Sequence, residues 1–152
     1  MTEARADELV EELLTASRAL VGAAVRSIAA APVDVTVAQH RVLVLLAAHG
    51  PQSVGQIAEQ LGVNPSNATR HCDRLQKLGL LARNRSAEDG RVVQIALTTE
   101  GRALLDAVTR HRRDALAEVV QRLPERERGA VLTALRRLNA ASLEVSDADW
   151  AG

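Results

Sequence analysis

The segment from Ser53 to Gly101 constrains the fold more than any other part of the chain. It opens on the capping-box pattern Ser53-Val-Gly-Gln56, which predicts the start of a short helix ending near Leu61. Gly62 comes next, and glycine adopts the left-handed conformation of a tight turn at little cost. The pattern therefore indicates a short helix closed by a sharp turn.

A second helix follows that turn directly. Asn64 is a favourable N-cap residue, and Pro65 suits the first helical position, where its missing N–H would have no partner. We expect this helix to run to about Leu78 and to stop at Gly79. Two short helices joined by a tight turn form a helix-turn-helix.

A β-hairpin is predicted immediately after the second helix. Residues 80–85 and 91–97 read as two short strands, and Ser86–Gly90 as the tip, with Asp89-Gly90 as the turn signal. Thr98 can cap the helix that follows. The order of helix, turn, helix, hairpin and helix indicates a winged helix-turn-helix, which lays its second helix in the major groove of DNA.

Long helices are predicted on both sides of this unit. Proline and capping signals mark their ends, and the expected spans are 3–30, 36–48, 98–122 and 125–143. The predicted fold class is therefore mainly α with a small β-hairpin wing. We expect a single domain over residues 1–152, with the winged helix-turn-helix at 36–98.

Charge is distributed unevenly along a chain whose net charge is zero. Residues 64–85 carry five basic side chains against the single acid Asp73, which is +4, whereas residues 1–14 carry five acids against one arginine, which is −4. The positive end coincides with the predicted helix-turn-helix, as expected for a protein that binds phosphates.

The remaining composition bears on compartment and core. The chain has no Phe or Tyr, one tryptophan (Trp150) and one cysteine (Cys72), so the core must be aliphatic and no intrachain disulfide can form. No apolar run is long enough to span a membrane, and the acidic N-terminus is unlike a targeting signal. We therefore expect a cytoplasmic protein with no membrane partner.

The second helix of the predicted helix-turn-helix has two distinct faces. Ala68, Cys72 and Leu75 share the inward face. The outward face carries the candidate DNA-binding residues Ser66, Asn67, Thr69, Arg70, Arg74 and Lys77. Asn67 and Arg70 suit base edges, whereas Arg74 and Lys77, further along, suit phosphates. The alternative for any of them is an ordinary solvated surface.

The wing offers a second group of candidates. Asp89 can hold the Arg91 guanidinium extended through a charge-assisted hydrogen bond, so that Arg91 enters the minor groove. The alternative is an exposed ion pair of little energetic value. Arg83 and Arg85 share one face of the first strand, where one can contact phosphate while Arg83 can instead brace the hairpin.

Three segments together resemble the MarR family of bacterial transcriptional regulators. They are VTVAQHRVLVLLAAHG, SVGQIAEQLGVNPSNATRHCDRLQKLGLLAR and EDGRVVQIALTTEGRALL, which include the family's R-L-x-K-x-G-L helix end, D-x-R wing and LT-x-E-G helix start. The resemblance is close over residues 36–105. One departure is His40, where the family commonly has an aromatic residue.

The resemblance implies a homodimer that interlocks through residues 3–30 and 123–145. Such a dimer would bind a pseudo-palindromic operator, repress neighbouring genes and release the DNA when a small ligand binds between the dimer helices and the winged part. The ligand is often an anionic aromatic molecule in this family, an expectation that the absence of Phe and Tyr weakens here. No effector-binding residue is assigned from the sequence.

The sequence contains no pattern typical of catalysis or metal binding. The four histidines form no local ligand pair, and no nucleophile–base or phosphate-loop motif is present. We therefore expect neither an enzyme nor a cofactor, and an inert, buried Cys72 rather than a redox switch. Two alternatives stay open: a low-specificity DNA binder without an effector, and a protein-interaction module that keeps the winged fold.

Overall fold

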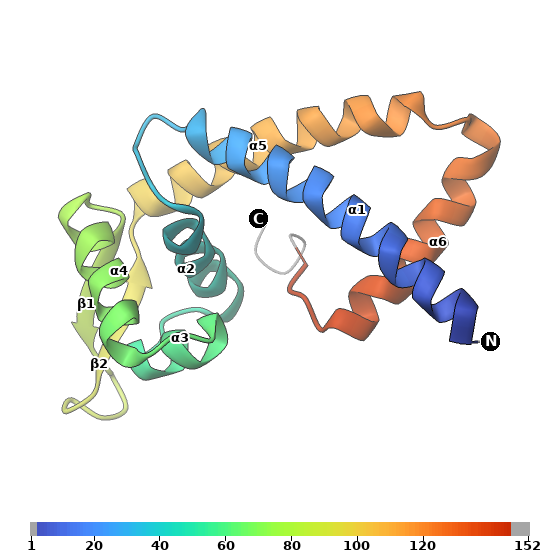
Figure 1. The fold of residues 1–152 in the computed structure, drawn as a ribbon. Coiled ribbons are helices and arrows are strands. Elements are labelled where there is room, and N and C mark those ends of the chain that lie inside the picture. Colours follow the sequence, from blue (N-terminus) through green and yellow to red (C-terminus); the bar gives the residue numbers. More distant parts are fainter. Residues whose placement is uncertain (1–2, 147–152) are drawn as a thin grey trace.

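The computed structural model describes residues 3–146 and divides into a winged part and a three-helix arm (Figure 1). The winged part contains α2 (Val37–His49), α3 (Val54–Leu61), α4 (Pro65–Lys77), β1 (Leu81–Arg85) and β2 (Val93–Leu97). The arm contains α1 (Glu3–Ala29), α5 (Thr99–Arg122) and α6 (Glu125–Ser142). The expected order of elements and the fold class are confirmed. Trp150 lies outside the described residues.

Both predicted capping boxes are present. The Thr36 hydroxyl accepts a hydrogen bond from the Gln39 backbone N–H at 3.1 Å, and the Gln39 side chain accepts one from the Thr36 N–H at 2.9 Å. Ser53 and Gln56 repeat the arrangement at 3.2 and 2.9 Å. Each box satisfies two backbone donors that a helix start otherwise leaves without partners, so α2 and α3 begin where the sequence places them.

The turn that separates α3 from α4 also follows the sequence. Gly62 ends α3 with a φ of 68°, in the left-handed region that favours glycine. The Asn64 side chain then accepts the Asn67 backbone N–H at 2.9 Å, with Pro65 as the first helical residue. Gly79 has a φ of 76° just past α4 and turns the chain into β1.

The hairpin differs from its prediction at the tip. The strands pair from Leu81↔Leu97 to Arg85↔Val93, and the loop is closed by the Ser86 N–H donating to the Val92 carbonyl at 2.8 Å. Among the described residues, the glycines with positive φ do not include Gly90. The predicted turn at Asp89-Gly90 is present, since the Val92 N–H donates to the Asp89 carbonyl at 3.0 Å. The loop is longer than predicted because the second strand begins at Val93 rather than at 91, and Gly90 does not need the conformation that only glycine takes easily.

The core lies inside the winged part and is aliphatic, as the composition requires. Its buried side chains come from every element of that part and from the first half of α5; the fully buried ones include Val42, Leu43, Ile57, Leu75, Ile95, Leu105 and Val108. By contrast α6 has no buried residue, and α1 buries only Ala23, Ser27 and Ile28. The arm therefore leaves much of its apolar surface exposed in a single chain.

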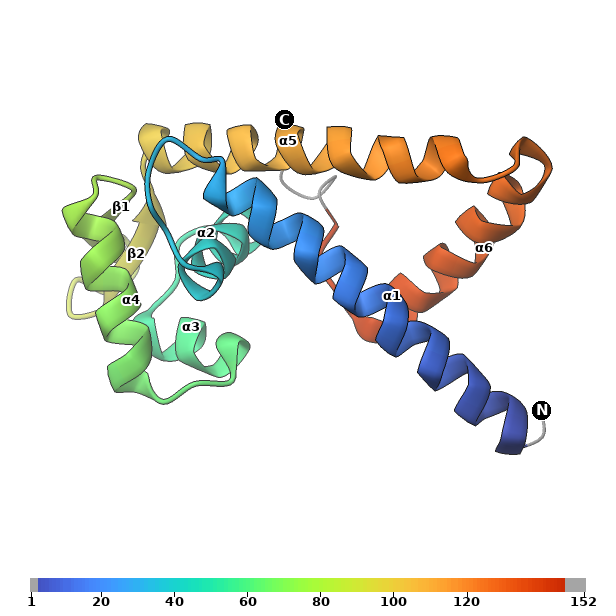
Figure 2. The same cartoon turned by 45° about the horizontal axis from the view of Figure 1, so that its top comes forward.

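Figure 2 shows how the arm is built. Helix α5 leaves the winged part and runs to the far end of the molecule, where Pro124 reverses the chain into α6. Helix α6 returns toward the winged part, and α1 packs on α5 near the winged part and diverges from it toward the N-terminus. The arrangement leaves a space between α1, α2, α5 and the chain that follows α6.

Candidate nucleic-acid interface and ligand cavity

Helix α4 presents the two faces that the sequence predicts. Ala68, Cys72 and Leu75 are at most 1% exposed and pack in the core with Ile57 of α3. The six outward candidates lie on the opposite side; five of them are exposed and Asn67 is half-buried. The structure therefore brings Ser66, Asn67, Thr69, Arg70, Arg74 and Lys77 together on one accessible helix face.

Hydrogen bonds within α4 order the first turns of this face. The Arg70 guanidinium donates to the Asn67 side-chain oxygen at 2.5 Å, so the two residues form one polar unit. The Ser66 hydroxyl donates to Asn64 at 2.7 Å, and the Thr69 hydroxyl donates to the Pro65 carbonyl at 2.8 Å. A guanidinium held by a neighbour loses less conformational freedom when it binds a second acceptor, so Arg70 is partly preorganised.

Arg83 makes contacts that match the bracing alternative, one of the two roles predicted for it. Its guanidinium forms an ion pair with Asp73 of α4 at 2.5 Å and also donates to the Gln76 side chain. These contacts tie β1 to α4 and thereby couple the wing to the helix. Arg85 in turn donates to the Gly90 carbonyl at 2.9 Å and supports the wing loop.

The predicted contact between Asp89 and Arg91 is wrong in its detail. The Asp89 carboxylate accepts the backbone N–H of Arg91 at 3.0 Å, and among the ion pairs of the described residues none joins the two side chains. The reason is that a short Asp side chain readily hydrogen-bonds the backbone two residues further on. The Arg91 side chain is exposed at the wing without that support.

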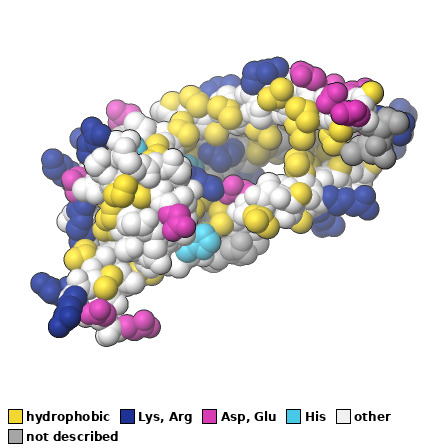
Figure 3. All heavy atoms as spheres, turned by 60° about the horizontal axis from the view of Figure 1, so that its bottom comes forward, with side chains coloured by type: hydrophobic (Ala, Val, Ile, Leu, Met, Phe, Trp, Pro, Cys, Tyr) yellow, Lys and Arg dark blue, Asp and Glu magenta, His cyan; other side chains and the backbone are white. Residues whose placement is uncertain are grey.

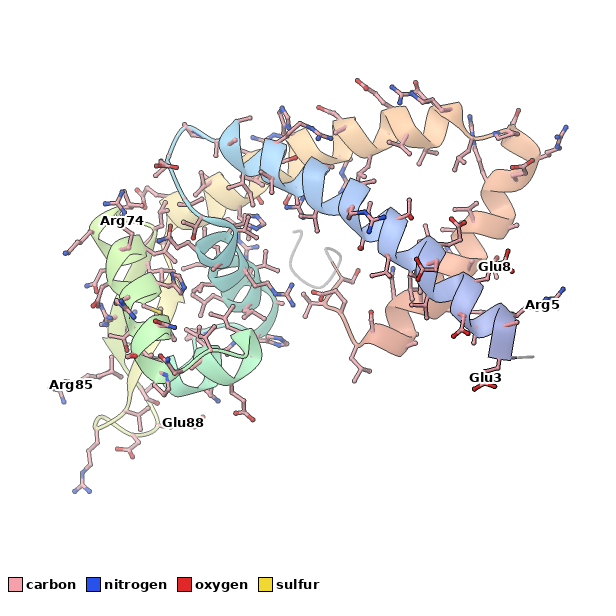
Figure 4. The ribbon with its side chains drawn as sticks, in the orientation of Figure 1. Glu3, Arg5, Glu8, Arg74, Arg85 and Glu88 are labelled. Atoms are coloured by element: carbon pink, nitrogen blue, oxygen red, sulfur yellow. The ribbon has the colours of Figure 1, made fainter. Side chains whose placement is uncertain are left out.

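The charge polarity predicted from the sequence is visible in space. Figure 4 shows Arg74 and Arg85 pointing outward from the winged part, whereas Glu3 and Glu8 lie at the far end of α1. The basic side chains of α4 and the hairpin thus lie at the opposite end of the molecule from the acidic start of α1, which also carries Arg5. A polyanion would be attracted to the winged end.

A second site, whose residues the sequence did not reveal, is a cavity of about 600 Å³ between the winged part and the arm. Figure 3 shows the hollow, with apolar side chains around its edge and charged side chains in its depth. Its apolar lining consists of Ala24, Ile28, Val37, Val44, Leu116 and Val145; its polar lining consists of His40, Arg41, Thr109, Arg112, Arg113 and Glu144.

His40 is the most unusual residue of this cavity. The side chain is 6% exposed, and its Nε2 has no hydrogen-bond partner among the described residues. Burial, together with the positive charges of Arg112 and Arg41, lowers the pKa of His40 to about 4. The imidazole is therefore neutral at pH 7 and carries one unused hydrogen-bonding atom in a cationic setting.

Arg41 and Glu144 close one side of the cavity. Two guanidinium nitrogens of Arg41 meet the two carboxylate oxygens of Glu144 at 2.6 and 3.1 Å. The hydrogen bond from Arg41 lowers the pKa of Glu144 below its usual value. The two residues are 103 positions apart, so no local pattern could have paired them.

Cys72 is buried, and that burial raises the pKa of its thiol, which opposes formation of the reactive thiolate. Within residues 3–146 no three His, Cys, Asp or Glu side chains are grouped to hold a metal ion. None of the described helices has the length and apolar character needed to cross a membrane.

A winged helix-turn-helix whose second helix is basic and exposed is typical of DNA-binding regulators, and here a cavity lies between this unit and the arm. The model of the MarR family matches residues 33–92. The chain resembles the HTH-type transcriptional repressor MdtR of Bacillus subtilis, at 39% identity over 61% of this chain and 60% of that protein. It thus spans less than two thirds of MdtR.

Solved structures agree with this assignment over nearly the whole chain. RV1404 from Mycobacterium tuberculosis has a TM-score of 0.88 at 36% identity, with 96% of this chain and 99% of that chain covered. BpsR of Bordetella bronchiseptica, whose DNA binding is regulated by 6-hydroxynicotinic acid, has a TM-score of 0.60 at 25% identity over 85% and 91%. The chain belongs to the MarR family of transcriptional regulators.

Proposed function

We propose that this protein is a homodimeric repressor that binds a pseudo-palindromic operator and releases it when a small molecule binds. The observation that carries the proposal is the accessible polar and basic face of α4, with Asn67 and Arg70 hydrogen-bonded to each other. Arg70 suits bidentate contact with guanine, and Arg74 and Lys77 suit phosphates. Because such a repressor acts on chromosomal DNA, we expect the protein to be cytoplasmic.

The exposed apolar surface of the arm supports a dimer. In α1 it includes Leu9, Val10, Leu14, Leu20, Val21 and Val25, each at least 45% exposed; in α6 it includes Val131, Leu132, Leu135 and Leu138. A contiguous apolar surface of this kind marks an interaction site. We infer that a second copy covers it through residues 3–30 and 123–145, which sets the two α4 helices about one turn of DNA apart.

The cavity supports a ligand-responsive mechanism. It lies between the arm, which would hold the dimer together, and the winged part, which would hold the DNA. A ligand there can change the distance between the two α4 helices, so that they no longer fit two major grooves at once. Ligand and DNA would then weaken each other's binding by the same factor.

The first test is a fluorescence anisotropy titration of the intergenic DNA beside the gene, with a random duplex as control, at two salt concentrations. We expect tight, selective, salt-dependent binding. Arg70→Ala should cost about 1–3 kcal/mol and relax the sequence preference. The matched control is Arg110→Ala, which removes an exposed arginine of α5 outside α4, the hairpin, the cavity lining and the expected dimer segments, and should leave DNA binding unchanged.

Each alternative function predicts a different result. A low-specificity binder without an effector would bind both duplexes equally. A protein-interaction module would bind neither at low salt, and Arg70→Ala would leave its activity unchanged. A monomer in light-scattering measurements at micromolar concentration would overturn the dimer.

A further inference from the structure

The cavity contains an acid-binding position that the chain itself fills. Arg41, Arg112 and Arg113 supply three positive charges to the lining, and Glu144 supplies one negative charge. The remaining walls are mostly aliphatic, and among residues 3–146 no Phe, Tyr or Trp side chain lines them. A lining with this excess of positive charge fits an anion with an apolar body.

The contact between Arg41 and Glu144 has the geometry with which an arginine binds the carboxylate of a ligand. Each carboxylate oxygen meets its own guanidinium nitrogen, at 2.6 and 3.1 Å, which is the two-point contact that arginine makes with free carboxylates. The side chains are 38% and 49% exposed. Exposed ion pairs contribute little net stability, so another carboxylate can replace Glu144 at low cost.

The chain that carries Glu144 is weakly held. Leu143 ends α6 with a φ of 56°, a left-handed conformation that is unfavourable for leucine, and its side chain is 89% exposed. Glu144 follows this turn directly and meets Arg41 of α2. Within one chain, little apolar burial therefore secures this turn, and the ion pair with Arg41 is a contact that links Glu144 to α2.

His40 offers a ligand the second polar contact. It is more than nine-tenths buried, it lines the same cavity as Arg41, and its Nε2 has no partner among residues 3–146. A buried polar atom without a partner is costly, and a ligand that bonds to it removes that cost. Arg41 and His40 both line this cavity, so one small molecule bound in it can contact both.

We propose that the Glu144 carboxylate occupies the place of the effector's acidic group, and that a small apolar carboxylate displaces it from Arg41 and hydrogen-bonds to His40. The inference rests on the proposed function, because it takes this cavity as the effector site. It also explains how ligand binding can reach the winged part. The Arg41–Glu144 pair joins the end of α6 to α2, so its displacement separates the arm from the winged part at this point.

The test is isothermal titration of the full chain with hexanoate, and with hexanamide as the uncharged probe. We expect hexanoate alone to bind. Glu144→Gln should tighten hexanoate binding about threefold to fivefold, the range expected for removing an exposed ion pair. Arg41→Gln should weaken it by about tenfold or more, because a charge-assisted two-point contact is lost. His40→Leu should also weaken it.

The matched control is Glu127→Gln, which removes an exposed acid of α6 that pairs with Arg126 outside the cavity. It should leave hexanoate binding as in the unaltered protein. The inference is overturned if Glu144→Gln leaves the affinity unchanged or weakens it, or if hexanamide binds as well as hexanoate. Selective operator binding by the same preparation shows that only this inference has failed, whereas loss of operator binding reports on the proposed function.

Discussion

Replacing Gly101 by alanine is expected to destabilise the protein, because α5 starts against the backbone of the hairpin. A Cβ at Gly101 would lie 2.2 Å from the Leu80 carbonyl oxygen and 3.1 Å from a Leu97 methyl carbon. Ordinary contacts begin at 3.4 Å, so the helix must move by about 1.2 Å. The neighbours on one side are backbone atoms, which cannot rotate away.

The magnitude follows from three contributions. Overpacking of this kind costs about 1–3 kcal/mol. Displacing the helix start also weakens its cap, in which the Thr98 hydroxyl accepts the Gly101 N–H at 3.0 Å, for about 1 kcal/mol. The higher helix propensity of alanine offsets about 1 kcal/mol of this loss. The net loss of about 1–3 kcal/mol corresponds to a fall in Tm of roughly 3–10 °C for a chain of this size.

The assay is thermal unfolding followed by far-UV circular dichroism at one fixed protein concentration, since a dimer's Tm depends on concentration. Gly55→Ala is the matched control, because that position also lies in a helix and its new Cβ would meet only the Ser53 hydroxyl at 3.8 Å. The control should be up to about 1 kcal/mol more stable than the original chain. A stabilising effect of both substitutions would refute the close approach of α5 to Leu80.

Two further predictions concern charge. The unfolded chain protonates His40 near pH 6.5 and the folded chain only near pH 4, so this residue's contribution to stability is complete above pH 6.5 and is lost as the pH falls toward 4. Urea unfolding across that range should show His40→Gln to be less sensitive to acid by up to about 3 kcal/mol; an unchanged pH profile would contradict the burial of a neutral imidazole. In anisotropy titrations, Arg74→Ala should reduce the salt slope by about one unit because a phosphate contact is lost. Arg83→Ala should weaken binding without that change because it braces the wing, and equal slopes for the two variants would contradict this division of roles.

Local signals allowed much of the fold to be predicted. The capping boxes at Thr36 and Ser53, the left-handed Gly62 and the cap at Asn64 each depend on atoms within four residues, so sequence spacing specifies them directly. The faces of α4 follow from the helical period alone, which is why Cys72 could be predicted as buried.

Predictions failed where several local solutions compete. The Asp89 carboxylate can accept either the Arg91 guanidinium or the Arg91 backbone N–H, and the structure has the second. The hairpin tip can likewise close with loops of different lengths, and its Asp-Gly pair did not decide between them. Arg83 had two possible roles until the fold brought Asp73 within reach of it.

The sequence by itself determined the order of the elements, the helix proposed to read DNA and the family, because these depend on short-range periodicity and on motifs. Only the tertiary structure decided which residues form the cavity. Arg41 and Glu144 meet across 103 residues, and His40 becomes a neutral, buried group only when α2 packs beside α5. Such contacts arise from the packing of distant elements. The free energy that selects them comes from many contacts across the core and not from the residues of any one segment.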